Sequence, residues 1–84
     1  MIAYAKEDID TAIPLLAESY QIASDLEDAN GIAQVGINLG YLLKQTGQTQ
    51  QAILIITASR DAFLLLGNRE KVALLNDWLQ QLPS

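Results

Sequence analysis

The sequence predicts an all-α protein built as an antiparallel array of helical hairpins, and three observations support this. Apolar and small residues recur at steps of three and four along nearly the whole chain, which is the period of a helix. The connectors between these stripes, at 26–31, 46–49 and 66–68, are short, so neighbouring helices should run antiparallel. Finally, the chain resembles itself when it is shifted by 40 positions.

The first stripe predicts a helix over 10–26. Its apolar and small face consists of Ile9, Ala12, Leu16, Ser19, Ala23 and Leu26. We expect this helix to begin near Asp10 or Thr11, because Pro14 is tolerated best in the first turn, where its missing N–H has no partner to lose.

The next segment, from Ala29 to the connector at 46–49, carries two stripes. One is small (Ala29, Ala33, Gly36, Gly40) and the other is apolar (Ile32, Val35, Leu39, Leu43). A glycine inside a helix costs about 1 kcal/mol relative to alanine, so Gly36 and Gly40 indicate close helix packing. We expect Gly40 to admit the following helix near Ala52, and Gly47 to form the turn between the two helices.

Two further stripes complete the chain. The first contains Ala52, Ile56, Ser59, Phe63 and Leu66 and ends at Gly67, a residue favoured just after a helix. The second begins at Asn68, continues through Val72, Leu75, Leu79 and Leu82, and ends at Pro83. No segment of useful length alternates with a period of two, so strands are not expected.

The 40-residue shift superimposes residues of the stripes. The matching pairs include Ala12 with Ala52, Ile13 with Ile53, Ser19 with Ser59, Leu26 with Leu66, Ala33 with Ala73, Leu39 with Leu79 and Leu42 with Leu82. The repeat resembles a tetratricopeptide repeat (TPR), with Leu39, Gly40, Ala52 and Ala12 at matching positions. It departs from the family at Gly36, Leu43, Ile56 and Leu16, where aromatic residues are usual. Its period resembles that of the longer-helix variety of the family.

The resemblance implies a TPR-like α-solenoid fragment of three long helices plus a short N-terminal helical turn. In a single domain over 1–84, residues 1–28 would form a partial first repeat, 29–67 a complete repeat and 68–82 a capping helix. Counted back 40 positions from Gly47, the preceding turn should lie at Glu7, which leaves only 1–6 for the earlier helix. The helix over 10–26 should then lack a packing partner. We therefore expect a piece of a longer array, or self-association through the N-terminal face.

The amino-acid composition excludes several kinds of functional site and partner. The chain has 84 residues, enough for one small domain, and contains neither cysteine nor histidine, which excludes disulfides, thiolate zinc sites and histidine proton shuttles. The apolar runs are much shorter than the roughly 20 residues of a membrane span, and the N-terminus carries no signal sequence pattern, which favours a soluble, cytoplasmic protein. The net charge is −5, with seven acids and one lysine in 1–28, so a nucleic-acid partner is not expected.

The sequence offers no clear catalytic or cofactor site. The stretch from Asp25 to Gly31 has some oxygen ligands of a calcium loop, but their alternation fails at Ala29 and Ile32. We expect Asp28 or Asn30 to cap the following helix instead. An enzyme or metal-dependent regulator would need a site that the sequence does not reveal. No catalysis, cofactor or metal is therefore expected.

Binding of another protein is the class that remains, because the resemblance implies a concave groove lined by the first helix of each repeat. The expected contact residues are Gln34, Ile37, Asn38, Tyr41, Lys44, Gln45, Leu74, Asp77, Trp78 and Gln81. Ile37 and Asp77 stand where basic groups would clamp a carboxylate, so a neutral peptide or helix is the expected ligand. Trp78 is an equally good candidate for covering the end of the core. The alternative function is a self-associating structural fragment of a longer repeat protein.

Overall fold

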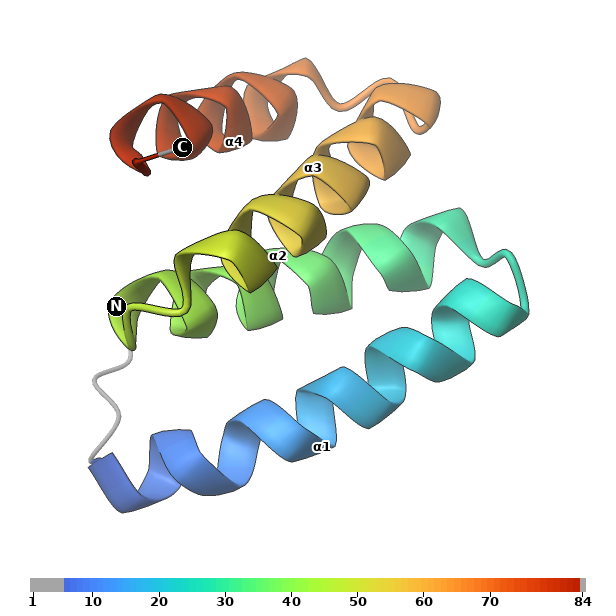
Figure 1. Cartoon of the computed structure of the whole chain (residues 1–84). Helices are drawn as coiled ribbons and strands as arrows, with labels where there is room; N and C mark the ends of the chain where they lie inside the picture. Colours follow the sequence, from blue (N-terminus) through green and yellow to red (C-terminus); the bar gives the residue numbers. More distant parts are fainter. Residues whose placement is uncertain (1–5, 84) are drawn as a thin grey trace.

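The computed structural model describes residues 6–83, with side chains over 9–83, and this part of the chain contains four helices and no strand. The helices are α1 (Lys6–Asp25), α2 (Ala29–Gln45), α3 (Thr49–Leu65) and α4 (Arg69–Gln81). They follow one another as a series of hairpins in chain order (Figure 1). The all-α prediction is confirmed, and a helical hairpin array is compatible with this arrangement. The described residues form four helices, of 20, 17, 17 and 13 residues, where three long helices and a short N-terminal turn were predicted.

Helix α1 begins earlier than predicted. Its first residue is Lys6, so Glu7 lies in a helix rather than in a turn, and Pro14 lies in the helix interior. Proline there removes the hydrogen bond that the carbonyl of Asp10 would accept. Both Asp10 and Pro14 are exposed, so water can solvate that carbonyl. The predicted N-terminal helical turn over 1–6 lies outside the described residues except for Lys6.

The three turns between the helices share one geometry at a spacing of 20 residues. Glu27, Gly47 and Gly67 have positive φ angles of 53°, 78° and 75°. In each turn the next N–H donates to a carbonyl five residues earlier: Asp28 to Ala23 at 2.9 Å, Gln48 to Leu43 at 3.0 Å and Asn68 to Phe63 at 2.9 Å. These are the hydrogen bonds of a glycine-type helix C-terminus. The roles predicted for Gly47 and Gly67 are confirmed.

Helices α2 and α3 approach each other closely through glycine. A Cβ atom would lie 2.8 Å from Cβ of Ser59 if built at Gly36, and 2.6 Å from Cγ1 of Ile56 if built at Gly40. The hydroxyl of Ser59 donates a hydrogen bond of 2.8 Å to the carbonyl of Ala33. Close packing at both glycines is therefore confirmed. The atoms nearest to the added Cβ at Gly40 belong to Ile56, which lies one turn after Ala52.

The core is formed mainly by α2 and α3 and is closed by α4. It consists of Ala33, Leu39, Leu43, Ala52, Ile56, Ala62, Phe63 and Leu75. Val35, predicted to be buried, is only half-buried. The side chain of Asn68 accepts a hydrogen bond from the N–H of Lys71 at 3.1 Å and caps α4. Asp28 occupies the corresponding position before α2, but its side chain makes no capping hydrogen bond.

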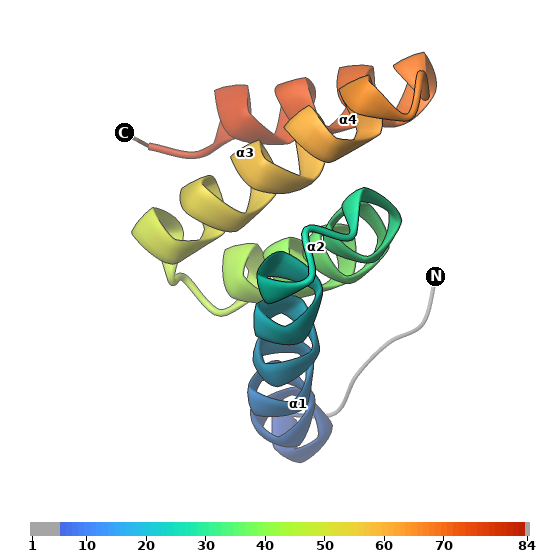
Figure 2. The same cartoon turned by 90° about the vertical axis from the view of Figure 1, so that its right-hand side faces the viewer.

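Helix α1 packs against α2, so the prediction that it lacks a partner was wrong. Ala23 is its buried residue, and Ile13, Leu16 and Tyr20 pack partly against the core. Figure 2 shows α1 projecting away from the layer that contains α3 and α4. Leu15 and Ile22 of α1, with Leu26 in the turn after it, form an apolar row that remains exposed. No helix within the described residues is long and apolar enough to cross a membrane.

Candidate functional site

The ten predicted contact residues lie on α2 and α4 and differ in exposure. On α2, Ile37, Tyr41 and Lys44 are half-buried, while Gln34, Asn38 and Gln45 are exposed. On α4, Trp78 is half-buried, while Leu74, Asp77 and Gln81 are exposed. The half-buried residues recur at steps of four and three along α2, so they follow one side of the helix.

Three of the predicted residues meet across the two helices. The ring centroids of Tyr41 and Trp78 are 5.8 Å apart, with an angle of 46° between the rings. The Nζ atom of Lys44 lies 5.7 Å from the centroid of the Trp78 ring. Such an ammonium–ring contact contributes about 0.5–1 kcal/mol at an exposed site. We call Tyr41, Lys44 and Trp78 the α2–α4 cluster.

Polar side chains beside this cluster are held in place on α4. The amide of Gln81 donates to the carboxylate of Asp77 at 3.0 Å. Asn76, two residues from Trp78 and therefore on another side of α4, accepts a hydrogen bond of 3.1 Å from Arg60 of α3. The face therefore combines aromatic surface, one cation and the hydrogen-bonded amide of Gln81, a combination suited to contact with another protein.

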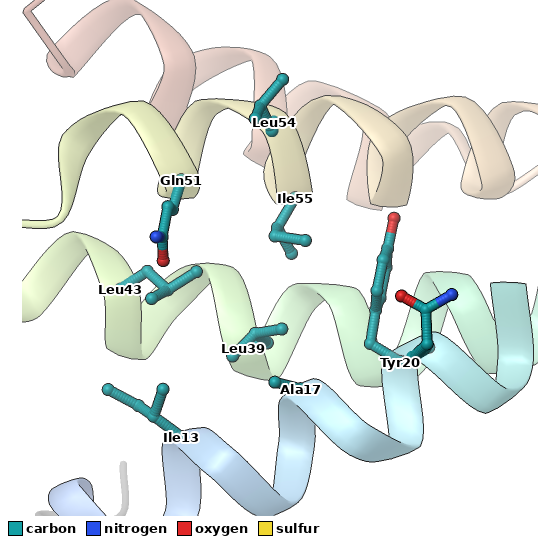
Figure 3. Close-up of a pocket in the computed structure, with 9 residues that line it drawn as sticks. Ile13, Ala17, Tyr20, Leu39, Leu43, Gln51, Leu54 and Ile55 are labelled. Carbon is teal, nitrogen blue, oxygen red and sulfur yellow. The ribbon is translucent and has the colours of Figure 1, made fainter.

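A hollow lies among α1, α2 and α3, and the sequence did not predict it. Its volume is about 270 Å³. Figure 3 shows that its side chains come from all three helices. They are Ile13, Ala17, Tyr20 and Gln21 of α1, Leu39 and Leu43 of α2, and Gln51, Leu54 and Ile55 of α3. The lining contains no charged side chain, so this hollow is suited to an apolar group.

A neighbouring space lies toward the C-terminal ends of α1 and α3. This second space, of about 410 Å³, is lined by Tyr20, Ser24, Glu27, Ala29, Ile32, Ala58, Asp61, Ala62 and Leu65. Tyr20 lines both spaces, so they lie next to each other along α1 and α3, and we call the two spaces together the α1–α3 trough. Residues 13–21 of α1 and 51–55 of α3 line the first space, and the later residues of both segments, 20–27 and 58–65, line the second. The two helices therefore run in the same direction along the trough.

The two ends of the trough differ in charge. Glu27 and Asp61 line only the second space. The carboxylate of Asp61 pairs with Arg60 at 3.1 Å. No described side chain forms an ion pair with Glu27. Between the two ends, burial raises the pKa of the Tyr20 phenol.

One sequence signal could have revealed the trough. Besides the core stripe of Ala52 and Ile56, α3 carries Leu54, Ile55 and Leu65, so its apolar residues surround the helix. A helix that is apolar on all sides is usually covered on all sides. Leu54 is nevertheless 71% exposed and Leu65 is 82% exposed. The excess of apolar residues on α3 therefore marks a surface that its own chain does not cover.

No family model, curated protein or solved structure matches the chain. Within the described residues, no group of three or more acidic, histidine or cysteine side chains is placed to hold a metal ion. Any assignment of function consequently depends on the two surfaces described above.

Proposed function

We propose that the chain is a protein-interaction module of the TPR-like α-solenoid type, which binds a peptide or helix of a partner on its α2–α4 face, the surface that carries the ten predicted contact residues and includes the α2–α4 cluster. The observation that carries this proposal is the meeting of Tyr41, Lys44 and Trp78 from two helices at a half-buried position. Tyrosine and tryptophan are enriched among residues that dominate binding energy at interfaces. The repeat-like phasing of α2 and α4, whose starts are 40 residues apart, also supports the proposal.

The chemistry of this face favours a largely neutral ligand. Its charged groups are Lys44, placed near the ring of Trp78, and Asp77, hydrogen-bonded to Gln81. Exposed amides at Gln34, Asn38 and Gln45 can pair with the backbone of an extended peptide. The aromatic surface would supply the apolar contacts, and the amides would fix the ligand's register.

Site-specific cross-linking can test this function. Benzoylphenylalanine placed at position 38 should cross-link the partner, which is then identified, purified and titrated against the protein. Tyr41→Ala should weaken binding at least about tenfold, because removal of an aromatic anchor commonly costs more than 1 kcal/mol. Leu64→Ala is the matched control, since Leu64 is exposed on α3 and belongs to neither described surface. Equal affinities for the two variants would contradict the proposal.

Self-association through the N-terminal face is the second candidate function. The exposed row formed by Leu15 and Ile22 of α1 and Leu26 in the turn after it favours this function, because such a row usually packs against another surface. Sedimentation equilibrium should then show a dimer or larger species that Ile22→Lys dissociates and Tyr41→Ala does not. Cross-links from position 38 to another copy of the chain, lost in Ile22→Lys, would favour this function over the first.

A further inference from the structure

The α1–α3 trough is a second surface, made by helices other than those of the α2–α4 face. Its apolar end is open, since Leu54 at its rim is 71% exposed. Leu39 and Leu43 form part of its lining and belong to the core. An apolar side chain placed there would contact buried leucines and remove the exposed surface of Leu54 from water, and both effects favour binding.

The other end of the trough selects for positive charge. Glu27 lines it and has no ion-pair partner among the described residues, whereas Arg60 is already engaged with Asp61 and Asn76. The stretch 9–28, which supplies the α1 wall and the turn after it, contains five carboxylates and no base. The acids in this stretch are Asp10, Glu18, Asp25, Glu27 and Asp28. This charge disfavours a second copy of the acidic chain and favours a cationic ligand.

The backbone at Glu27 provides an independent indication. Its φ of 53° is the conformation that Gly47 and Gly67 adopt at the two equivalent turns. A residue with a side chain is strained there, whereas glycine is not. Strained backbone positions are often retained where the side chain has a function. At Glu27, the side chain that replaces glycine lines the trough with a carboxylate.

The spacing of the two ends defines the ligand. From Ala17 to Ser24 on α1, and from Leu54 to Asp61 on α3, the trough advances by seven residues. At 1.5 Å per residue this corresponds to about 10 Å, or two helical turns. We propose that the α1–α3 trough binds an amphipathic helix of a partner protein. The helix would place a large apolar side chain in the first hollow and, seven residues along, a lysine or arginine in the second space, whose lining includes the carboxylate of Glu27.

A short synthetic helix can serve as the probe. It is a hydrocarbon-stapled, alanine-based peptide with one leucine and, seven residues away, one arginine, made in both sequence orders. Titration into ¹⁵N-labelled protein should shift the amide signals of Ala17, Gln51, Ile55 and Glu27 for one of the two orders. A control peptide with alanine in place of the leucine should bind at least about tenfold more weakly. A peptide with glutamine in place of the arginine should bind about three- to fivefold more weakly.

Paired variants of the protein connect the binding to the trough. Leu54→Glu should weaken the leucine–arginine peptide at least about tenfold. Leu64→Glu, on the same helix and 64% exposed, should leave its affinity unchanged. Glu27→Gln should remove the preference for arginine over glutamine in the peptide. Glu27→Gly should do the same while raising Tm, so loss of this preference in that variant cannot be attributed to unfolding.

Four results would overturn the proposal. The first is that both control peptides bind as tightly as the leucine–arginine peptide, and the second is that Leu54→Glu and Leu64→Glu change its affinity equally. The third is a preference for arginine over glutamine that survives in Glu27→Gly. The fourth is that the amide signals shift only around Trp78. Analytical ultracentrifugation adds a fifth. A dimer that Leu54→Glu dissociates would show that a second copy, rather than a cationic helix, occupies the trough.

Discussion

The two hairpins that share α2 have similar turns and different packing. The α1–α2 turn at Glu27 and the α2–α3 turn at Gly47 have the same pattern of backbone hydrogen bonds. Beyond the turns, α3 lies close against α2 through Gly36 and Gly40. In contrast, α1 buries mainly Ala23 and leaves an apolar row exposed.

This difference shows that the turn sets the direction of the next helix and that small residues set how closely it packs. Ser59 is fully buried, but its hydroxyl has a hydrogen-bond partner, because the close approach brings it within 2.8 Å of the carbonyl oxygen of Ala33. Helix α1 approaches α2 closely at Gly31, where an added Cβ would lie 3.0 Å from Cβ of Ala23, but no buried polar side chain of α1 within the described residues forms a comparable hydrogen bond. The space between α1 and α3 remains open as a result, and the α1–α3 trough occupies it.

The largest expected effect comes from truncating one residue in each hairpin. Ile56 is 0% exposed and fills the space above Gly40, so Ile56→Ala should lower the free energy of unfolding by about 2–5 kcal/mol. Leu16 is half-buried on α1, so Leu16→Ala should cost only about 1 kcal/mol. Urea unfolding followed by circular dichroism measures both. Equal losses would mean that the two hairpins are equally tight.

Adding a methyl group at two glycines of α2 sharpens the comparison. Gly40→Ala forces Ile56 to move and should destabilise the protein by about 1–2 kcal/mol, even after the gain in helix propensity. At Gly31 the new Cβ would meet the Asp28 carboxylate at 2.8 Å and Cβ of Ala23 at 3.0 Å. The exposed Asp28 side chain can rotate away, whereas Cβ of Ala23 is fixed to the α1 backbone, so α1 must shift slightly. Because helix propensity improves, Gly31→Ala should lower the free energy of unfolding by only about 0.5 kcal/mol, which is less than the loss at Gly40. Thermal unfolding of the pair provides the test, and a larger loss at Gly31 would contradict the picture of a loose α1–α2 contact.

Adding a side chain at the Gly47 turn should lower the free energy of unfolding, and removing the side chain at the Glu27 turn should raise it. A side chain at Gly47 would meet nothing within 4 Å, so Gly47→Ala tests the backbone conformation alone and should cost about 1 kcal/mol. Glu27→Gly should instead stabilise the protein by about 0.5–1 kcal/mol, because it relieves the strain of a positive φ. A destabilised Glu27→Gly variant, measured by urea unfolding, would indicate that the Glu27 side chain makes a stabilising contact.

The smallest effect is expected at alkaline pH. Because burial raises the pKa of Tyr20 above 10.0, the phenol ionises more readily in the unfolded chain than in the folded one. Stability from this group is therefore complete below pH 10 and is lost as the pH rises through the folded-state pKa. Tyr20→Phe should show less loss of Tm than the original protein between pH 9 and about 11. If the Tm of Tyr20→Phe and of the original protein fell equally with pH, the Tyr20 phenol would be as well solvated in the folded chain as in the unfolded one.

The sequence was sufficient to predict the helices after residue 28, since their stripes, Gly47, Gly67 and Asn68 are local signals. The predicted start of α1 was wrong, because Pro14 was expected in the first turn of the helix but lies in its interior. The repeat offset also placed a turn at Glu7, where the chain continues as a helix. A 40-residue offset describes shared packing positions, and it need not continue into a part of the chain with other neighbours.

Site residues were predictable only where one helix face determines them. The step from Tyr41 to Lys44 and the offset to Trp78 were sufficient to bring those side chains together. The α1–α3 trough depends on the angle at which α1 leaves the layer of α3 and α4, visible in Figure 2, and a periodic pattern carries no information about that angle. Ile13 and Ile55 were therefore assigned to helices but not to a shared hollow.

The succession of contacts, from α1 to α2, α2 to α3 and α3 to α4, also has a kinetic consequence. When packing joins mainly consecutive helices, most contacts are close in sequence, and low contact order is associated with folding in microseconds to milliseconds. The α2–α3 hairpin supplies most of the core and is the natural nucleus. The helices α1 and α4 would add to it independently, so the amides of α1 should exchange with solvent through local opening that leaves the central hairpin intact.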